Sequence, residues 1–455
     1  MNLSSQGRTL APVLALFLVG CAAADRQSYD TIRIDVDRAV IVDPQQPEAD
    51  DPVVRGPVLD RAAYVRAVLH RNLSIEAARQ GWRAALARVR QSGALEDPMV
   101  TLDVAPLSIG SSSARFGFGA TISQHLPWPG KLPLEESVAR AEADAEKSDY
   151  EAARRELALT ASLLFDEYFV AARSLDINAQ HVELMRTMRA GALAQFEAGR
   201  ASAQDPLQAE FELTHMEHDA VILASQSDVT TARMNELLHR PPERPLPPPP
   251  KDLPAPAGPD VTDVQRLENE AVDRRPDVMA ARQRARAEGA RGDRAARESL
   301  PDITISTSYN SMWDTPEHRW MVGLGFNLPI QTGRRGGAVD QANASRAKFE
   351  ADAERMADAA RTEVVVALKQ LEESAHVLHI YEERLLPIAR DEVRAARSAF
   401  TASQAPFVAA IDAEKNLRTV ELELEVARAD HHRRRVELDR ALGRMPGLDE
   451  KDGAQ

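Results

Sequence analysis

The chain has 455 residues, of which 44% are hydrophobic and 28% are charged, while only 5% are aromatic. This composition suits long helices rich in Ala, Leu, Glu and Arg better than a β-sandwich or an ordinary enzyme core. The net charge is -14, and no basic cluster with interleaved aromatic residues occurs, so we expect no nucleic acid partner.

The N-terminus has the pattern of a cleaved export signal. Arg8 precedes an apolar run from Leu10 to Val19, which leads into Leu18-Val19-Gly20-Cys21. Cys21 is the only cysteine, so no intramolecular disulfide can form. The four residues that end at Cys21 resemble a bacterial lipobox, which implies removal of residues 1–20 and attachment of lipid, such as palmitate, at Cys21. A cysteine within an ordinary signal peptide is the alternative.

The chain contains two copies of one unit. An offset of 203 aligns Ser74–Gln80 with Asp277–Gln283, Pro98 with Pro301, Thr101 with Thr304 and Gly130 with Gly333, and an offset of 204 aligns Phe196 with Phe400 and Glu210 with Glu414. Ten prolines between Pro241 and Pro259 separate the copies. We therefore expect a signal peptide (1–20), an N-terminal extended anchor segment (21–58), repeat 1 (59–239), a proline-rich linker (240–260), repeat 2 (261–443) and a polar C-terminal tail (444–455).

A β-hairpin is predicted after Pro98 and another after Pro301, because the helical period gives way there to alternation. The apolar positions are Val100, Leu102, Val104, Phe116, Phe118, Ala120, Ile122, Ile303, Ile305, Tyr309, Val322, Leu324 and Phe326. The positions between them are mostly Gly, Ser and Thr. Strands of about ten residues with one apolar and one small polar face suit an outer-membrane barrel. Four strands cannot close such a barrel, so association of several chains is implied. Charges interrupt every apolar run beyond the N-terminus, and no membrane-spanning helix is expected.

Long helical hairpins follow the strands. From Leu132 to Glu197 the chain has only Pro133 and Gly191 as helix-breaking residues, which predicts a rod of roughly 100 Å. Apolar residues spaced alternately by four and three indicate a coiled-coil seam, at Leu157, Ala161, Leu164, Tyr168, Ala171 and Leu175 and again at Val364, Leu368, Leu371, Ala375 and Leu378. Pro387 should interrupt the second rod. The rods turn back at 198–202 and 402–406, and second helices run to about Leu238 and Leu442.

In this order of elements, the chain resembles the TolC family of outer-membrane efflux proteins. The resemblance rests on the duplication, the two hairpins, the turn Phe196–Ser202, and the endings Leu237-Leu238 and Ala441–Gly443, and it covers about Leu59 to Gly443. It implies a mainly α fold with a transmembrane β-barrel contribution, in which a homotrimer forms a twelve-stranded barrel and a periplasmic helical tunnel. The stretch Gln124–Lys131 further resembles the heavy-metal export branch, the CzcC and CusC type.

The resemblance also implies a function and partners. It predicts a channel in the outer membrane that contacts outer-membrane lipid, has a long periplasmic portion and catalyses no reaction. A periplasmic adaptor would dock on the turns, at Gly199, Arg200, Ser403 and Gln404, and an inner-membrane pump of the RND type would supply the energy. No cofactor is expected, and heavy-metal cations are one possible cargo. A pore-free coiled-coil tether and a duct for type I protein secretion are the alternatives.

Acidic residues just past the turns are the candidate pore aperture. The family has two aspartates one helical turn apart in the second copy; Asp412 matches the second, whereas Ala409 replaces the first. Asp205 occupies the position in repeat 1 that corresponds to Ala409. A helix N-cap before Pro206 is an equally good interpretation of Asp205.

The sequence shows no arrangement typical of a catalytic or metal site. No Ser/His/Asp set, phosphate-binding loop or Cys/His cluster is present. The adjacent pair His431-His432 beside three arginines is expected on a solvated helix face rather than at a metal. Met185 and Met188 fit helix packing.

Overall fold

The computed structural model describes residues 56–448, except for 111, 113–114, 254–262 and 403. Cys21, the predicted signal peptide and most of the predicted anchor segment therefore lie outside the described residues. Among the helices that are described, none combines the length and the apolar character needed to cross a membrane.

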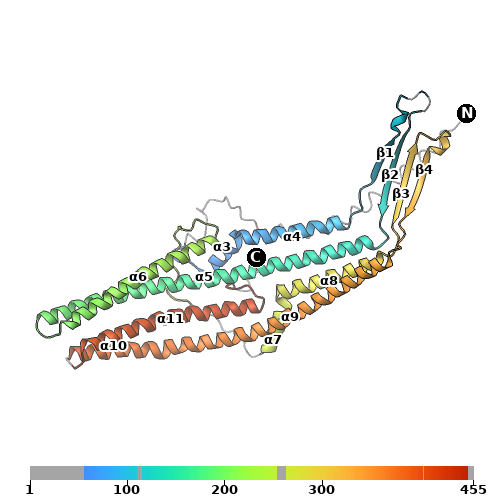
Figure 1. Ribbon diagram of the computed structural model, residues 1–455. Helices are drawn as coiled ribbons and strands as arrows, with labels where there is room; N and C mark the ends of the chain where they lie inside the picture. The colour runs from blue at the N-terminus through green and yellow to red at the C-terminus, as the bar shows by residue number, and fades with distance from the viewer. Residues whose placement is uncertain (1–55, 111, 113–114, 254–262, 403, 449–455) are drawn as a thin grey trace. The chain divides into compact units, whose positions relative to one another are not determined.

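Helices and strands follow the same order in both repeats, as the predicted duplicated unit requires (Figure 1). In repeat 1 they are α3 (Arg61–Arg71), α4 (Leu73–Ser92), β1 (Met99–Val104), β2 (Phe118–Leu126), α5 (Lys131–Glu197) and α6 (Gln204–Leu237). In repeat 2 they are α7 (Val264–Arg274), α8 (Pro276–Arg297), β3 (Ile303–Asn310), β4 (Trp320–Phe326), α9 (Thr332–Ile380), a π-helical turn (Tyr381–Leu385), α10 (Leu386–Thr401) and α11 (Phe407–Ala441). The predicted fold class, mainly helical with two β-hairpins, is confirmed.

A short helix comes first in each repeat, α3 in repeat 1 and α7 in repeat 2, and the periodicity of the sequence did not indicate either one. Asp60 caps α3 by accepting a hydrogen bond from the Ala63 amide at 2.9 Å, and Asp263 caps α7 in the same way. Asn72 and Arg275, at the ends of these helices, have extended backbones with φ -72° and ψ 124°. The chain therefore bends at equivalent places in the two repeats.

The chain divides into two compact units, each with segments from both repeats. Unit 1 comprises residues 78–150 and 277–356, and unit 2 comprises the described residues of 40–77, 151–276 and 357–455. Unit 1 contains the strands, and unit 2 contains the turns of the helical hairpins.

Unit 1 holds a four-stranded antiparallel sheet in the order β1-β2-β3-β4 (Figure 1). Directly paired residues lie on the same face, and the register pairs Leu102 with Ala120, Ala120 with Tyr309 and Tyr309 with Trp320. The apolar positions predicted within these strands thus share one face. The other face carries mostly small or polar residues, namely Thr101, Asp103, Gly119, Thr121, Ser123, His125, Thr304, Ser306, Ser308, Asn310, Gly323 and Gly325, together with Met99 and Met321.

The apolar face of the sheet is exposed in the single chain. Leu102 is 73% exposed and Val322 84%. Aromatic rings cross the sheet in one row, with centroids 5.6 Å apart for Phe118 and Tyr309 and 5.3 Å apart for Tyr309 and Trp320. Soluble monomers rarely expose a contiguous apolar surface of this kind.

The strands are shorter than the ten residues expected, with six in β1, nine in β2, eight in β3 and seven in β4. Pro106 follows β1 and begins a short 3-10 helix, because proline offers no amide to the ladder. Phe116, predicted to lie in a strand, precedes β2.

A buried lysine joins the sheet to the long helix of repeat 1. The Lys131 ammonium donates to the Asp302 carboxylate at 2.8 Å and to the Leu300 carbonyl at 3.2 Å, while Asp302 also accepts from the Trp128 amide at 2.8 Å. Gly130 has φ +92°, where a side chain would be strained, and its carbonyl accepts from Arg297. The stretch Gln124–Lys131 therefore forms a strand-to-helix joint that ties repeat 1 to repeat 2.

Unit 2 has a core around α3, α5 and α6. The central side chains are Leu59, Tyr64, Val65, Val68, Phe165, Tyr168, Met234 and Leu238. The proline-rich linker packs on this core, because the Tyr168 hydroxyl donates to the Pro247 carbonyl at 3.1 Å and the Leu59 amide donates to the Pro248 carbonyl at 2.8 Å. The described part of the linker is therefore held against the helices.

A buried ionic cluster lies beside this core. Arg61 of α3 donates to Asp166 of α5, and a second guanidinium nitrogen lies 3.0 Å from Nδ1 of His432 in α11. Burial raises the pKa of Asp166 to about 7, although Arg61 and Arg433 act to lower it. His432 is buried, so the prediction that His431-His432 occupies a solvated face was wrong for this residue. Adjacent helical residues point in different directions, and His432 faces α3.

Pro387 interrupts the second rod as predicted, and the interruption takes the form of a π-helical turn. The Leu386 amide donates to the Tyr381 carbonyl, five residues back. Proline cannot supply an amide and its ring clashes with the carbonyl four residues earlier. A widened turn accommodates both constraints without ending the helix.

The charge state of Asp166 predicts a pH dependence of stability. Because its pKa is raised on folding, its contribution is complete at pH below about 4 and is lost as pH rises through about 7. The thermal unfolding midpoint of the wild type should therefore fall between about pH 5 and pH 8 by more than that of Asp166→Asn. Glu167→Gln, at an exposed neighbour on the same helix, should retain the wild-type dependence. Equal slopes in wild type and Asp166→Asn would contradict the assignment.

Candidate aperture at the helix turns

Both helical hairpins of unit 2 reverse through the same backbone hydrogen bond. The Arg200 amide donates to the Gln195 carbonyl at 2.9 Å, and the Gln404 amide donates to the Ala399 carbonyl at 2.8 Å. These six-to-one bonds satisfy carbonyls that the helix end leaves free. Gly199 has φ +70°, which glycine adopts without strain.

Three of the four predicted docking residues lie on the surface of these turns. Gly199, Arg200 and Gln404 are exposed. Ser403 lies outside the described residues. Arg200 and Gln404 thus present their side chains to solvent.

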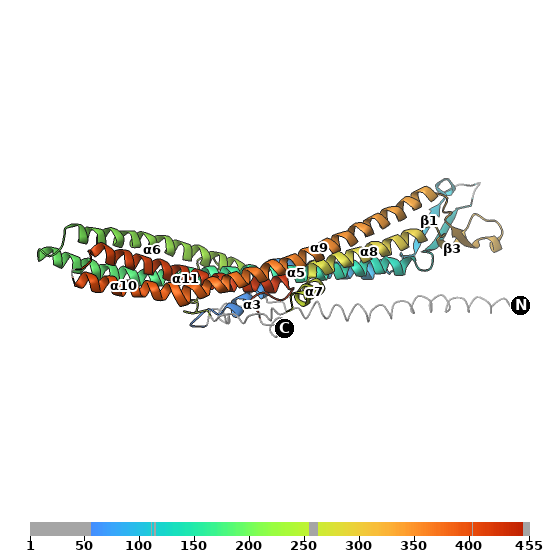
Figure 2. The same ribbon diagram turned by 90° about the horizontal axis from the view of Figure 1, so that it is seen from below.

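The two helical hairpins of unit 2 run close to each other near their turns (Figures 1 and 2). A compact apolar cluster holds them together there. Its buried members are Met185, Ala192, Ala209, Leu213, Met216, Phe407 and Ile411. Phe400 packs on the cluster from the other side of the second turn, with its ring centroid 5.2 Å from that of Phe407. Met185 is buried in the cluster and Met188 packs against the cluster, which confirms the packing role expected for both residues.

The two candidate aperture residues lie at this end of unit 2. Asp412 is exposed between the buried residues Ile411 and Ala413, so its carboxylate lies off the apolar cluster. Asp205 is half-buried in the first turn of α6, four residues before Ala209 of the cluster. The N-cap of α6 is Ala203, without a side-chain hydrogen bond. The alternative role of Asp205 as the cap is therefore wrong, because the helix begins two residues earlier than that role requires.

A ladder of polar contacts, farther from the turns than the apolar cluster, was not predicted from the sequence. From α11, the Lys415 ammonium donates to Glu212 at 2.9 Å, and Arg418 donates to both Asp219 and Asn178 at 2.7 Å. One turn further, His181 of α5 lies 3.0 Å from Glu421. In the sequence, the spacing of Lys415 and Arg418, three residues apart on α11, was the one pattern that pointed to these contacts. It could not identify their partners, which lie in repeat 1.

Charged groups in this ladder are partly removed from water. Burial acts to raise the pKa of Asp219, but the hydrogen bond and charge of Arg418, with contributions from His215 and His218, hold it below its ordinary value. Glu414 is buried and pairs with Arg397 of α10 at 2.5 Å. Buried carboxylates with partners of this kind fix the mutual position of the helices that carry them.

No group of three or more His, Cys, Asp or Glu side chains within the described part of the chain is arranged to hold a metal ion.

Removal of Arg418 should weaken the contact between the hairpins. Arg418→Met removes the donor to the buried Asn178 oxygen and leaves Asp219 with only its histidine neighbours, a loss of about 1–3 kcal/mol. The thermal unfolding midpoint should fall accordingly. Arg394→Met is the matched control, because Arg394 pairs with Asp391 at the exposed surface and such pairs contribute about 0.5 kcal/mol. Equal midpoints for the two variants would show that the ladder does not stabilise the hairpins.

Comparisons with known proteins identify related folds. Residues 267–444 match the family model described as outer membrane efflux protein. A comparison with curated proteins finds no match. Among solved structures, the chain is similar to the outer-membrane channel OprN, with 20% identity and a TM-score of 0.70 over 89% of this chain and 99% of that chain.

Two further structures show the same similarity. CusC, whose structures concern folding and transmembrane channel formation, has 17% identity and a TM-score of 0.73 over 89% of this chain and 97% of its own. The outer membrane protein VceC from Vibrio cholerae has 16% identity and a TM-score of 0.71 over 84% of this chain and 96% of its own. Residues 267–444 thus match the outer membrane efflux protein model, and the chain as a whole has the fold of these outer-membrane channels.

Proposed function

We propose that the chain is the outer-membrane channel component of a tripartite efflux system, a passive duct for solutes that catalyses no reaction. The observation that carries this proposal is the sheet of unit 1. One face is apolar and exposed, while the other carries Gly, Ser and Thr. Such a sheet suits a position between lipid and a water-filled lumen.

The open edges of the sheet support a trimer. β1 and β4 each pair on one side only, and their free amides and carbonyls need partners in a membrane. A sheet of four strands is too small to enclose a lumen. Three copies would join β1 of one chain to β4 of the next and close a barrel of twelve strands.

The exposed turns support docking of a periplasmic adaptor, through Gly199, Arg200, Ser403 and Gln404. An inner-membrane pump of the RND type would then drive transport through the assembly. The stretch Gln124–Lys131 resembles the heavy-metal branch, but Trp128 and Lys131 use their polar groups to bind Asp302 within the joint. This structural role explains the stretch without any contact to cargo, so the resemblance does not select the cargo. Metal cations therefore stay one candidate cargo, alongside other solutes.

Conductance in planar lipid bilayers is the direct test of the duct. Purified protein should migrate as a heat-modifiable trimer and give discrete channels of low conductance. A pore-free coiled-coil tether would fractionate with the outer membrane but conduct no ions. Type I secretion would show as loss of a secreted protein in a deletion strain that keeps its ordinary tolerance of metals and drugs.

The two faces of the sheet should differ in their tolerance of lysine. Leu102→Lys places a charge on the apolar face and should cost about 2–4 kcal/mol if that face meets the middle of the membrane. Thr101→Lys is the adjacent control on the polar face and should be milder. The yield of membrane-inserted protein measures both. Equal tolerance would argue for a sheet that does not face lipid.

The aperture residues should determine ion selectivity. Threefold symmetry would bring three copies of Asp412 near the axis, and clustered carboxylates in a narrow tunnel attract cations. We expect a cation-selective channel in which Asp412→Ala reduces selectivity more than Asp205→Ala does, since Asp205 is half-buried. Reversal potentials under a salt gradient give the ranking. Unchanged selectivity and conductance in Asp412→Ala would remove this residue from the aperture.

The proposed lipid anchor is tested separately. Labelled palmitate should enter the wild-type protein and not Cys21→Ser, because no other cysteine is present. The variant should still insert in part, since the sheet has its own apolar face. Label that persists in Cys21→Ser would exclude an anchor at this residue.

A further inference from the structure

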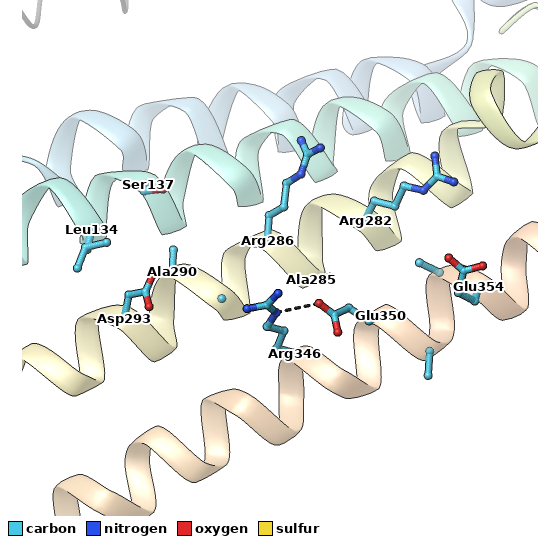
Figure 3. A pocket seen from close by; sticks show the side chains of 13 residues that line it. Leu134, Ser137, Arg282, Ala285, Arg286, Ala290, Asp293, Arg346, Glu350 and Glu354 are labelled. Carbon is cyan, nitrogen blue, oxygen red and sulfur yellow. Dashed lines mark hydrogen bonds and ion pairs between the residues drawn. The ribbon is translucent and has the colours of Figure 1, made fainter.

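An open groove of about 830 Å³ runs along one face of α8 in unit 1 (Figure 3). Ala285, Gly289 and Ala290 of α8 lie along it, with Leu134 of α5 at one side and Ala353 of α9 at the other. We call this surface the α8 groove. Its volume falls in the range of about 300–1,000 Å³ that is common for small-molecule sites.

Repeat 1 fills the corresponding place with aromatic rings. At the offset of 203, Ala285 corresponds to Trp82 and Ala353 to Tyr150. These two rings are buried and stacked, with centroids 5.8 Å apart and an interplanar angle of 27°. The ammonium of Lys147 lies 5.5 Å from the Trp82 ring. The α8 groove therefore exists where two methyl groups replace two large rings.

The burial pattern supports this correspondence of positions. Ala139 and Ala342 are both buried, as are Ala161 and Val364, and each pair is separated by 203 residues. Tyr150 and Ala353 lie between these pairs, at the same offset. The long helices of the two repeats are thus in the same rotational register along the groove.

Charged groups at the groove differ in whether they are paired. Arg346 donates to Glu350 at 2.8 Å. Arg282 and Arg286, one turn apart on α8, have no carboxylate partner among the described residues, and Figure 3 shows both extending from α8 toward α5. Asp293 and Glu354 also line the groove, nearer its ends (Figure 3). One Arg286 nitrogen donates to the Gln283 side chain at 3.4 Å. The Arg282 guanidinium and the remaining Arg286 nitrogens are therefore available to a ligand beside an apolar floor.

We propose that the α8 groove binds a planar aromatic anion. The flat ring would lie on Ala285 and Ala353, in the place that the Trp82 and Tyr150 rings take in repeat 1. The carboxylate or sulfonate would face Arg282 and Arg286, because guanidinium groups bind such anions through paired hydrogen bonds and stack on aromatic faces. This site is independent of the proposed duct, since the groove is present in one chain.

Fluorescence anisotropy tests the proposal with two dyes that share one ring system. Fluorescein carries negative charge and rhodamine 123 positive charge. Full-length protein in detergent micelles should bind fluorescein saturably, above an empty-micelle baseline, and at least tenfold more tightly than rhodamine 123. Ala285→Trp restores the side chain of repeat 1 and should weaken fluorescein binding at least tenfold.

Matched variants separate a site from general dye adsorption. Ala296→Trp, at an exposed alanine of α8 outside the groove, should bind fluorescein as the wild type does. Arg282→Gln combined with Arg286→Gln should remove the preference for the anion while the ring still binds. A thermal melt of each variant confirms folding, and Ala353→Tyr provides a second way to fill the groove.

Two results would overturn the proposal. One is the absence of saturable fluorescein binding to the wild type, together with a loss of trimer in Ala285→Trp, which would make the groove a contact between copies. The other is equal binding by the wild type and by folded Ala285→Trp and Ala353→Tyr, which would place the dye elsewhere on the molecule.

Discussion

Strand β2 of repeat 1 pairs with strand β3 of repeat 2, and much of unit 1 depends on the register of this pairing. Leu126 lies opposite Ile303 at one end and Ala120 opposite Tyr309 near the other. A slip of one residue would move every apolar side chain of one hairpin to the opposite face. The same register brings Asp302 next to Trp128 and Lys131, so the buried lysine contact forms only when the two hairpins align. One ladder thus gives the sheet its two faces and joins the repeats.

The regular parts of the fold could be predicted because each depends on local periodicity. The helix expected from Leu132 to Glu197 spans Lys131–Glu197, and the alternation after Pro98 and Pro301 gives the two hairpins. The parts that were missed depend on contacts between distant segments. No local pattern shows that His432 turns toward Arg61. The short helix α7 ends at Arg275, where the following Pro276 disfavours a helical backbone. The helix α3 ends in the same way at Asn72, which no proline follows.

The candidate aperture could be predicted only to the level of the turns. Gly199 indicated the first reversal, and the repeat offset located the second. The exposure of Asp412 and the partial burial of Asp205 follow from how α11 and α6 pack around Ile411 and Ala209. The polar ladder through Arg418 joins residues about 200 positions apart, and a single sequence carries no direct sign of such a pairing.

The π-helical turn before Pro387 accounts for a numerical detail of the duplication. Ser374 lies before the turn, and the residue that corresponds to it in repeat 1 is Ala171, at an offset of 203; both are buried. Ala389 lies after the turn, and the residue that corresponds to it is Met185, at an offset of 204; both are buried as well. A π-helical turn encloses one residue more than an α-helical turn. Repeat 2 has therefore absorbed a single-residue insertion inside its long helix rather than at its end. Without that widened turn, every side chain beyond it would be rotated by about 100° around the helix axis, and the two hairpins could not present equivalent tips.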